Sequence, residues 1–115
     1  MEKVISYTIN EGFSSGTSLQ GYLTTTYDRL VEMFGKPSYN DSDPYSKVNA
    51  EWLLTIKVQD GDDEDDWCYH DVTIYNWKTG YVPTEEYQWH VGGRNLWAQD
   101  YVEQIMNQNM KPEYV

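Results

Sequence analysis

The stretch "AEWLLTIKVQDGDDEDDWCYHDVTIYNW" (residues 50–77) contains two strand-like segments on either side of a run of acids. In the first segment, apolar side chains recur at every second position and predict a strand with one buried face: Ala50, Trp52, Leu54, Ile56 and Val58. In the second segment, Cys68, Val72 and Ile74 fall on one face, and four rings fall on the other: Trp67, Tyr69, Tyr75 and Trp77. The two segments therefore predict an antiparallel hairpin whose acidic turn covers residues 59–66.

The rest of the chain predicts one or two further strands and two long loops. Residues 3–9 alternate as a strand and divide into two faces, namely Val4, Ser6 and Thr8 against Ile5, Tyr7 and Ile9. The Gly- and Ser-rich residues 10–21 and the polar residues 38–49 predict loops. Residues 87–91 ("YQWHV") predict a short last strand, which the Gly-Gly pair at 92–93 ends.

Two helices are predicted, each with a start signal and an apolar stripe. In residues 24–37 ("TTTYDRLVEMFGKP"), Thr25 and Asp28 fit a capping box, and Gly35 marks the end. The second helix follows Asn95 as its N-cap and buries one stripe: Ala98, Tyr101, Val102, Ile105 and Met106. The order β-α-β-β-β-α predicts a single α+β domain over residues 1–115, in which an antiparallel sheet of three to four strands carries both helices on one face.

The charge balance excludes several classes of partner. The chain has 19 acids against 8 bases and a formal net charge of −11, so it repels phosphate and anionic lipid. The sequence therefore predicts that the chain binds neither nucleic acid directly nor a membrane surface. No segment has the ~20 apolar residues of a membrane helix, and the first ten residues lack the apolar core of a signal peptide. Cys68 is the single cysteine and forms no internal disulfide, so a reducing cytosol is the expected compartment.

The acid run contains six carboxylates: Asp60, Asp62, Asp63, Glu64, Asp65 and Asp66. Its glycine does not have the register of an EF-hand calcium loop, so a specific calcium site is not expected. The run is either a solvated turn or an acidic finger for a cationic groove. Without these six acids the chain has 13 acids against 8 bases, which argues against a mimic of DNA over the whole surface.

The rings of the second segment define another candidate surface: Trp67, Tyr69, Tyr75 and Trp77. If the helices cover the opposite face, these rings lie on an open sheet, and large exposed apolar patches mark binding sites. Such rings pack against a partner protein or stack on a base. The alternative is that the first strand or the two long loops cover them.

Catalytic and metal-binding residues are not expected. Cys68 and His70 share a strand face, and Asp71 and His90 are further ligand types. However, no Cys-x-x-Cys or His-x-x-x-His pair anchors them, and a closed zinc site needs four ligands. A Cys/His nucleophile needs a base within hydrogen-bond reach, which spacing alone does not provide. The sequence therefore predicts no metal, no cofactor and no enzyme activity.

Four segments resemble a group of small accessory proteins encoded by tailed bacteriophages: "LVEMFGKPSY" (30–39), "AEWLLTI" (50–56), "VTIYNWKTG" (72–80) and "WHVGG" (89–93). The resemblance covers most of residues 22–106, and it implies a virus-encoded protein that acts on a host system in the bacterial cytosol. The hairpin turn of that group is shorter, which directs attention to residues outside the turn: Tyr75, Asn76, Trp77, Lys78, Trp89 and His90.

Two functions fit these features. The first is a stoichiometric inhibitor of a host defence or nucleic-acid-processing protein, of the anti-CRISPR or anti-restriction type, whose six acids and four rings bind a basic nucleic-acid-binding surface. The second is a small-ligand module, such as a sponge for a nucleotide immune signal, with the Gly-Gly turn and a ligand group of Tyr75, Trp77, Lys78, Trp89, His90 and Arg94. The sequence leaves open whether the chain forms a homodimer.

Overall fold

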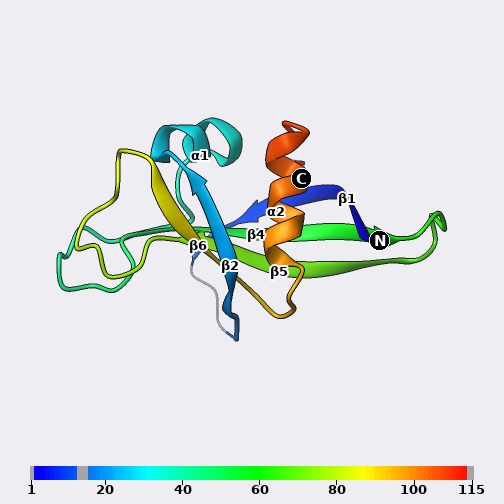
Figure 1. Cartoon of the computed structure of the whole chain (residues 1–115), viewed down its shortest axis with the longest axis horizontal. Coiled ribbons are helices and arrows are strands. Elements are labelled where there is room, and N and C mark those ends of the chain that lie inside the picture. Colours follow the sequence, from blue (N-terminus) through cyan, green and yellow to red (C-terminus); the bar gives the residue numbers. More distant parts are fainter. Residues whose placement is uncertain (1, 13–15, 114–115) are drawn as a thin grey trace.

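The described part of the chain folds into one antiparallel sheet with two helices (Figure 1). The computed structural model describes residues 2–12 and 16–113. Within these residues the elements are β1 (Glu2–Asn10), β2 (Ser18–Thr25), α1 (Tyr27–Phe34), β3 (Tyr39–Asn40), β4 (Ala50–Asp60), β5 (Trp67–Tyr75), β6 (Tyr87–Gly93) and α2 (Ala98–Asn107). The α+β class is confirmed, but the predicted number of three to four strands is too low, since the described residues form six.

Two of the strands lie in or next to segments that the sequence predicted as loops. β2 begins inside residues 10–21, and it buries only Leu23, so it lacks the apolar alternation that identifies a strand. β3 lies inside residues 38–49 and is a two-residue pairing with the start of β4. Both strands exist because a neighbouring strand offers its backbone, which a local sequence pattern does not show.

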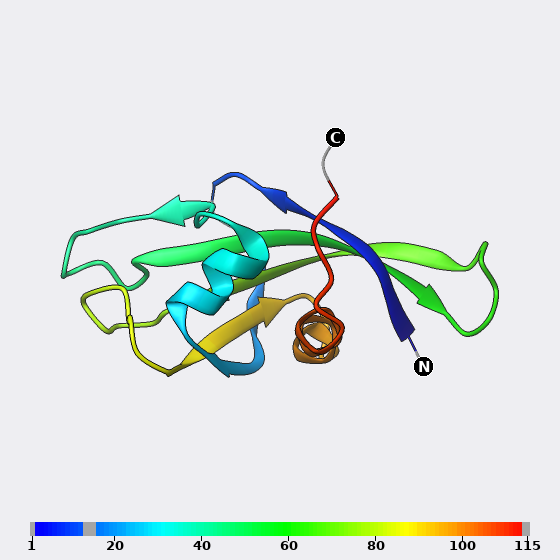
Figure 2. The same ribbon diagram turned by 90° about the horizontal axis from the view of Figure 1, so that it is seen from above.

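The sheet has the strand order β1-β4-β5-β6-β2, with β3 paired to β4, and each pairing is antiparallel. It curls, so that its two edge strands β1 and β2 both contact α2. Figure 2 shows α2 end-on, between the end of β6 and the start of β1. Both helices contribute side chains to the same core on the inner face of the sheet. α2 lies between the two edge strands, β1 and β2.

The predicted buried face of β4 is confirmed, because Ala50, Trp52, Leu54, Ile56 and Val58 are all fully buried. The two largest core side chains, Trp52 and Trp89, meet edge to face with their ring centroids 5.6 Å apart. Each indole also donates a hydrogen bond to one end of α1. Trp52 Nε1 lies 2.9 Å from the carbonyl oxygen of Gly35, and Trp89 Nε1 lies 3.3 Å from that of Thr25. The indole pair therefore fixes α1 at both ends while it fills the core.

α2 joins the two open edges of the sheet through two glutamine side chains. Gln104 accepts the Val4 N–H at 2.9 Å and donates to the Glu2 carbonyl at 3.1 Å, so it pairs with β1 as a neighbouring strand would. Gln99 accepts the Tyr22 N–H of β2 at 2.9 Å. The Gln99 side chain reaches that amide across Gly21, where a Cβ atom would collide with it. The helix therefore satisfies edge amides that no strand of the described chain pairs.

β1 contains a bulge that changes the predicted alternation. The register shifts between Val4 and Ser6, so Ile5 is the extra residue on this strand. Val4 and Tyr7 are consequently both buried, although the sequence placed them on opposite faces. The prediction was wrong because strict alternation assumes an unbroken ladder.

The start of α1 lies one residue later than predicted. Thr26 is the N-cap, and its hydroxyl accepts the Arg29 N–H at 3.1 Å, so the predicted capping box of Thr25 and Asp28 is wrong. Thr25 is unsuited to this role because it is the last residue of β2. Gly35 ends the helix as predicted, with a left-handed φ of 82° and its N–H bonded to the Val31 carbonyl at 2.8 Å.

The start of α2 also differs from the prediction. Trp97 is the N-cap, and Asn95 lies two residues earlier, where its Oδ1 accepts the Trp97 N–H at 2.9 Å. The predicted stripe is otherwise confirmed, with Met106 partly buried and four residues fully buried: Ala98, Tyr101, Val102 and Ile105. Neither helix of the described residues has the length and apolar character needed to cross a bilayer.

Gly92 and Gly93 continue β6 to its end, so the predicted strand end at Val91 and the predicted Gly-Gly turn are wrong. A Cβ atom on Gly92 would lie 2.7 Å from the Thr73 methyl, and one on Gly93 would lie 2.7 Å from Cβ of Ala98. The two glycines are therefore required for close packing of β6 against β5 and α2.

We expect Gln104→Leu to lower the free energy of unfolding by about 2 kcal/mol, because it leaves the half-buried Val4 N–H and Glu2 carbonyl without partners. Urea unfolding measures this loss. Gln108→Leu is the matched control, because Gln108 is exposed and lies one turn later, at the C-cap of α2. It should change the free energy of unfolding by less than about 0.5 kcal/mol. Equal losses in the two variants would show that the edge hydrogen bonds contribute nothing specific.

Candidate functional site

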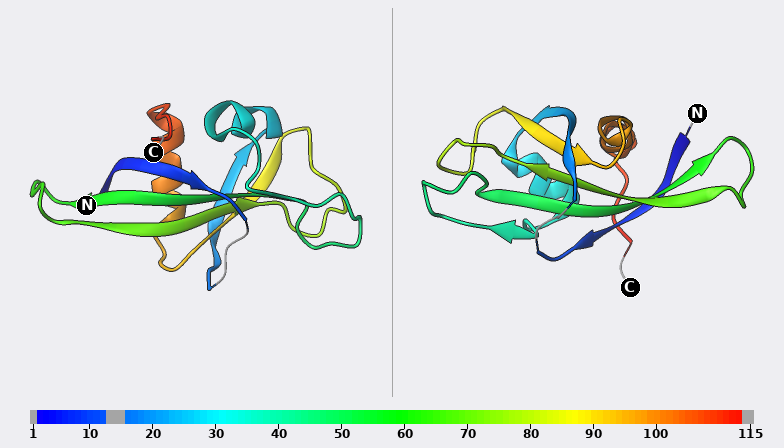
Figure 3. Two further views of the ribbon diagram at one scale, coloured as in Figure 1. Left: turned by 180° about the vertical axis from the view of Figure 1, so that it is seen from behind. Right: turned by 90° about the horizontal axis from the view of Figure 1, so that it is seen from below.

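The six acids of the hairpin lie at its projecting end, which we call the acidic tip: Asp60, Asp62, Asp63, Glu64, Asp65 and Asp66. All six are exposed, and the hairpin extends beyond the body of the molecule, as the two views of Figure 3 show. The molecule is accordingly elongated, with extents of 46 × 26 × 26 Å. None of the three ion pairs among the described residues includes an acid of the tip. The carboxylates are therefore accessible to a partner.

The backbone of the acidic tip is held by its own hydrogen bonds. The Asp60 N–H donates to the Asp66 carbonyl at 2.8 Å, and the Asp66 N–H donates to the Asp63 carbonyl at 3.1 Å. The Asp63 side chain accepts the Asp65 N–H at 2.9 Å, and Gly61 supplies a left-handed φ of 65°. Because the turn is already ordered, its charges have a defined arrangement before any partner binds.

Two of the predicted rings, Trp67 and Tyr69, adjoin the acidic tip on the outer face of the sheet, opposite the core. They are 44% and 59% exposed, and their ring centroids lie 5.3 Å apart in an edge-to-face arrangement. Lys57 on β4 places its Nζ 4.3 Å from the centroid of the Trp67 ring. This cation–π contact steadies the indole and leaves its other surfaces open.

The other two predicted rings, Tyr75 and Trp77, lie near the opposite end of the hairpin. Tyr75 follows Tyr69 by six positions, a distance of about 20 Å along β5. Asp71 and Thr73 occupy the outer face between them. The four rings that the sequence grouped together therefore form two separate pairs, and only the first pair adjoins the acidic tip.

The second pair belongs to a row of rings that crosses the outer face from β5 to β2, here called the aromatic row: Trp77, Tyr75, His90 and Tyr22. Tyr75 lies 6.1 Å from Trp77 and 5.4 Å from His90, and His90 lies 5.1 Å from Tyr22, all between ring centroids. Burial lowers the pKa of His90, so its imidazole is neutral at pH 7. The row is thus an uncharged ring surface that the sequence only partly predicted, since Tyr22 lies on the missed strand β2.

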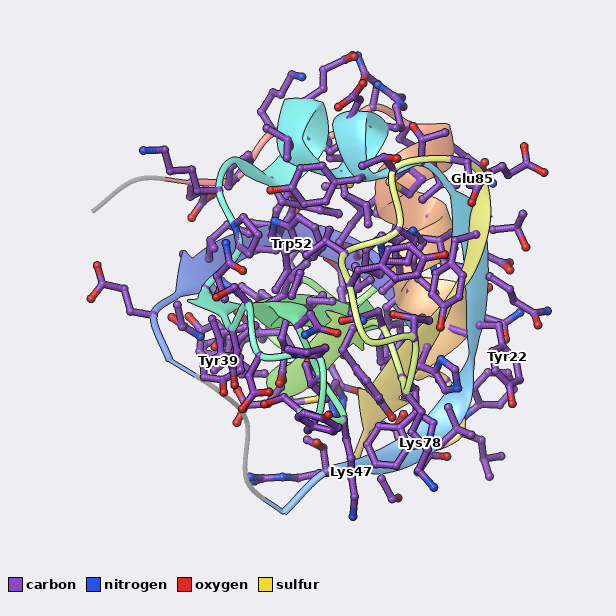
Figure 4. The ribbon with its side chains drawn as sticks, turned by 90° about the vertical axis from the view of Figure 1, so that its left-hand side faces the viewer. Tyr22, Tyr39, Lys47, Trp52, Lys78 and Glu85 are labelled. Carbon is purple, nitrogen blue, oxygen red and sulfur yellow. The ribbon has the colours of Figure 1, made fainter. Side chains whose placement is uncertain are left out.

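Two lysines meet at the Trp77 end of the aromatic row. Lys47 and Lys78 place their Nζ atoms 6.0 Å and 5.7 Å from the centroid of the Trp77 ring. Figure 4 shows both side chains reaching outward at this end of the molecule. They also line a shallow groove of about 460 Å³ between their two loops, together with residues 44–46 and 79–80. A ring beside two cations is a suitable surface for an anionic aromatic ligand.

The two loops that carry these lysines are joined by buried asparagines. Asn76 Oδ1 accepts the backbone N–H groups of Asn49 and Ala50 at 2.8 and 2.9 Å. Its amide group donates to Asn49 Oδ1 at 3.0 Å and to the Thr79 hydroxyl at 2.7 Å. Asn76, to which the resemblance drew attention, is fully buried and therefore positions the loops instead of contacting a ligand.

Two members of the predicted ligand group lie elsewhere. Trp89 is fully buried on the inner face, on the other side of the sheet from His90, so its assignment to a ligand surface is wrong. Period-two alternation already separates these neighbouring residues. Arg94 is exposed and lies 3.8 Å from the Asp71 carboxylate, away from the lysines at Trp77.

A further cluster forms where the start of β1 meets the base of the acidic tip. Cys68 Sγ lies 3.2 Å from His70 Nε2, which in turn lies 3.8 Å from Glu2 Oε2. Desolvation, followed by the negative charges of Glu2, Asp66 and Asp60, raises the pKa of the Cys68 thiol. The thiol therefore stays protonated, whereas an activated nucleophile needs electropositive surroundings. The sequence paired Cys68 with His70 but missed Glu2, which is distant in the chain.

No model of a known protein family matches the chain, and no curated protein or solved structure matches it. The resemblance to accessory proteins of tailed bacteriophages therefore stays a prediction.

Proposed function

We propose that this chain is a non-enzymatic binding protein that inserts its acidic tip into a basic, nucleic-acid-binding surface of another protein and blocks it. The observation that carries this proposal is the accessibility of six carboxylates on one ordered, projecting turn. A stoichiometric inhibitor of a host defence or nucleic-acid-processing protein would act in this way, which agrees with the phage context that the resemblance implies.

The acidic tip and the adjacent rings supply different parts of the binding free energy. Uncompensated charges attract a basic surface over a Debye length of about 10 Å at 0.1 M salt, so they accelerate association and orient the two proteins. Exposed Trp and Tyr side chains are enriched among the residues that dominate interface energies. Trp67 and Tyr69 are placed to make such contacts once the acidic tip has entered the groove.

The distribution of charge favours one inserted finger over a general imitation of DNA. Six of the 19 acids lie at one end of a 46 Å molecule, and the remainder of the chain has 13 acids against 8 bases. A DNA mimic needs negative charge spread along an extended surface, because duplex DNA carries one charge per ~1.7 Å of its axis. A compact pocket lined by Lys and Arg is therefore the complementary partner surface.

The test is retention of bacterial nucleic-acid-binding proteins on the immobilised chain at low salt. We expect a bound protein that duplex DNA displaces, and we expect its affinity to fall at least tenfold when the tip is neutralised by D62N, D63N, E64Q, D65N and D66N. The affinity of this variant should also depend less steeply on salt, because fewer charges contribute. Circular dichroism verifies that the variant is folded.

The matched control removes five exposed acids outside the tip, namely E11Q, E32Q, E85Q, E86Q and E113Q, and thus changes the net charge equally. It should retain nearly the full affinity. Equal weakening of both variants would mean that net charge, and not the acidic tip, attracts the partner. Unchanged binding by the tip variant would refute the proposal.

The lysines at Trp77 favour a second function, the binding of a nucleotide with its base on the aromatic row and its phosphates at Lys47 and Lys78. We expect cyclic dinucleotides or cyclic ADP-ribose-type ligands to raise the melting temperature, and Trp77→Ala to abolish this rise. Trp67→Ala is the reciprocal control, because it should weaken protein binding and leave the thermal rise intact. A panel of such ligands that gives no rise with the unmodified chain would remove this second function.

A further inference from the structure

The cluster of Glu2, Cys68 and His70 brings together three side chains of the types that bind zinc. Their ligand atoms all lie within 4.8 Å of one another. Cys68 and His70 are two residues apart on β5 and therefore face the same side, while Glu2 begins β1. The strand order places β4 between β1 and β5, so the site forms only when this part of the sheet is assembled.

The distances suit a single small cation. Zinc binds sulfur at about 2.3 Å and nitrogen or oxygen at about 2.0–2.2 Å, so ligand atoms of a tetrahedral site lie roughly 3.3–3.6 Å apart. The observed distances are 3.2 Å from Sγ to Nε2 and 3.8 Å from Nε2 to Oε2. These two pairs need adjustments of a few tenths of an ångström. The third pair, Sγ and Oε2, lies within 4.8 Å and needs a movement of up to about 1 Å, which rotation of the Glu2 side chain can supply.

α2 orients the ligand that comes from β1. The Tyr101 hydroxyl donates to Glu2 Oε1 at 2.7 Å, which leaves Oε2 as the oxygen that lies near His70. Gln104 holds the Glu2 carbonyl, and the Tyr101 ring stacks on the imidazole of His70 with centroids 5.3 Å apart. Such outer contacts are typical of metal ligands, which they hold in position.

We propose that Glu2, Cys68 and His70 bind one Zn²⁺ ion, independently of the inhibitor function. The carboxylates of Glu2, Asp60 and Asp66 lie close enough to Cys68 to act on it electrostatically, and their negative charge favours a divalent cation at the same place. Binding replaces the thiol proton by the metal and releases that proton to solvent. Glu2 also lines a cavity of about 470 Å³ with Asp60, Trp97, Asp100 and Tyr101, which has room for a water molecule as the fourth ligand.

Asn95 contacts the ring nitrogen of His70 that does not face the proposed metal, so a substitution at position 95 should change metal affinity. Asn95 Oδ1 accepts the Trp97 N–H, so its amide nitrogen faces His70 Nδ1 at 3.2 Å and matches the tautomer with the ring proton on Nε2. Zinc binding at Nε2 moves this proton to Nδ1, which then needs an acceptor. An aspartate at position 95 would accept both N–H groups, as in the carboxylate–histidine–zinc arrangement.

The test is titration of the full chain with Zn²⁺ against a chromophoric chelator, with Co²⁺ as a spectroscopic substitute. We expect one equivalent to bind with proton release, and a thiolate-to-cobalt charge-transfer band. Cys68→Ser should remove this band, and both Cys68→Ser and His70→Gln should weaken binding about 100-fold. Asn95→Asp should instead strengthen binding about tenfold, which a merely structural role of position 95 would not do.

The tip-neutralised variant separates this site from loose binding to the acidic tip, and it should keep the stoichiometry and the cobalt band. Circular dichroism verifies that each variant is folded. Absence of binding at free Zn²⁺ concentrations up to about 10 μM would overturn the proposal, because three-ligand sites with oriented side chains bind far more tightly. Equal affinity of Cys68→Ser, His70→Gln and the unmodified chain would also overturn it.

Discussion

The closure of the curled sheet by α2 is the constraint on which the rest of this structure depends. A sheet with edge strands β1 and β2 exposes backbone N–H and C=O groups along both edges, and these groups need partners. Gln104 supplies partners for two such groups of β1 and Gln99 for one of β2, so the helix bridges the two edges at these points. The same helix buries Tyr101 and Val102 in the core, which couples edge pairing to hydrophobic burial. Because α2 fixes the first residues of β1, it also fixes Glu2 beside the base of the projecting hairpin.

This arrangement lets the fold tolerate a dense group of charges. β4 and β5 continue past the body of the molecule, so the six acids of the tip are surrounded by water, where like charges at 4 Å interact with only about 1 kcal/mol. The core needs none of these residues, since its largest members come from the body: Tyr7, Trp52, Trp89 and Tyr101. The charge of the acidic tip is thus separated from the packing that holds the fold, and the tip is available for recognition.

The sequence predicted the features that local periodicity encodes and missed those that depend on distant partners. The buried faces of β4 and α2 follow from alternation or from helical spacing, and they are confirmed. On β5, Val72 and Ile74 are buried as predicted, whereas Cys68, which the sequence placed on the same face, is exposed. β2 was missed because Leu23 is its single buried side chain, and the bulge at Ile5 was missed because a register shift has no local signal. Trp89 was assigned to a ligand surface because its neighbour His90 lies there, although alternate residues of a strand face opposite sides. At the candidate sites, the sequence placed Trp67 and Tyr69 on one strand face and left open whether loops cover them; the structure exposes both. Glu2 and Tyr22 join their clusters only through the three-dimensional pairing of strands.

The period-two geometry of β5 gives this strand two chemistries without conflict. Trp67 and Tyr69 face outward beside the acidic tip, where flat rings and free carboxylates are suited to a protein partner. Cys68 and His70 alternate with them and face the other side, where Glu2 and Tyr101 approach from β1 and α2. A change in one set therefore leaves the contacts of the other set largely intact. The two sets still share one scaffold, because an ion held by Glu2, Cys68 and His70 would tie the start of β1 to the base of the hairpin. Such a tie would reduce the freedom of the hairpin relative to the body, and with it the entropy lost when the acidic tip enters a partner's groove.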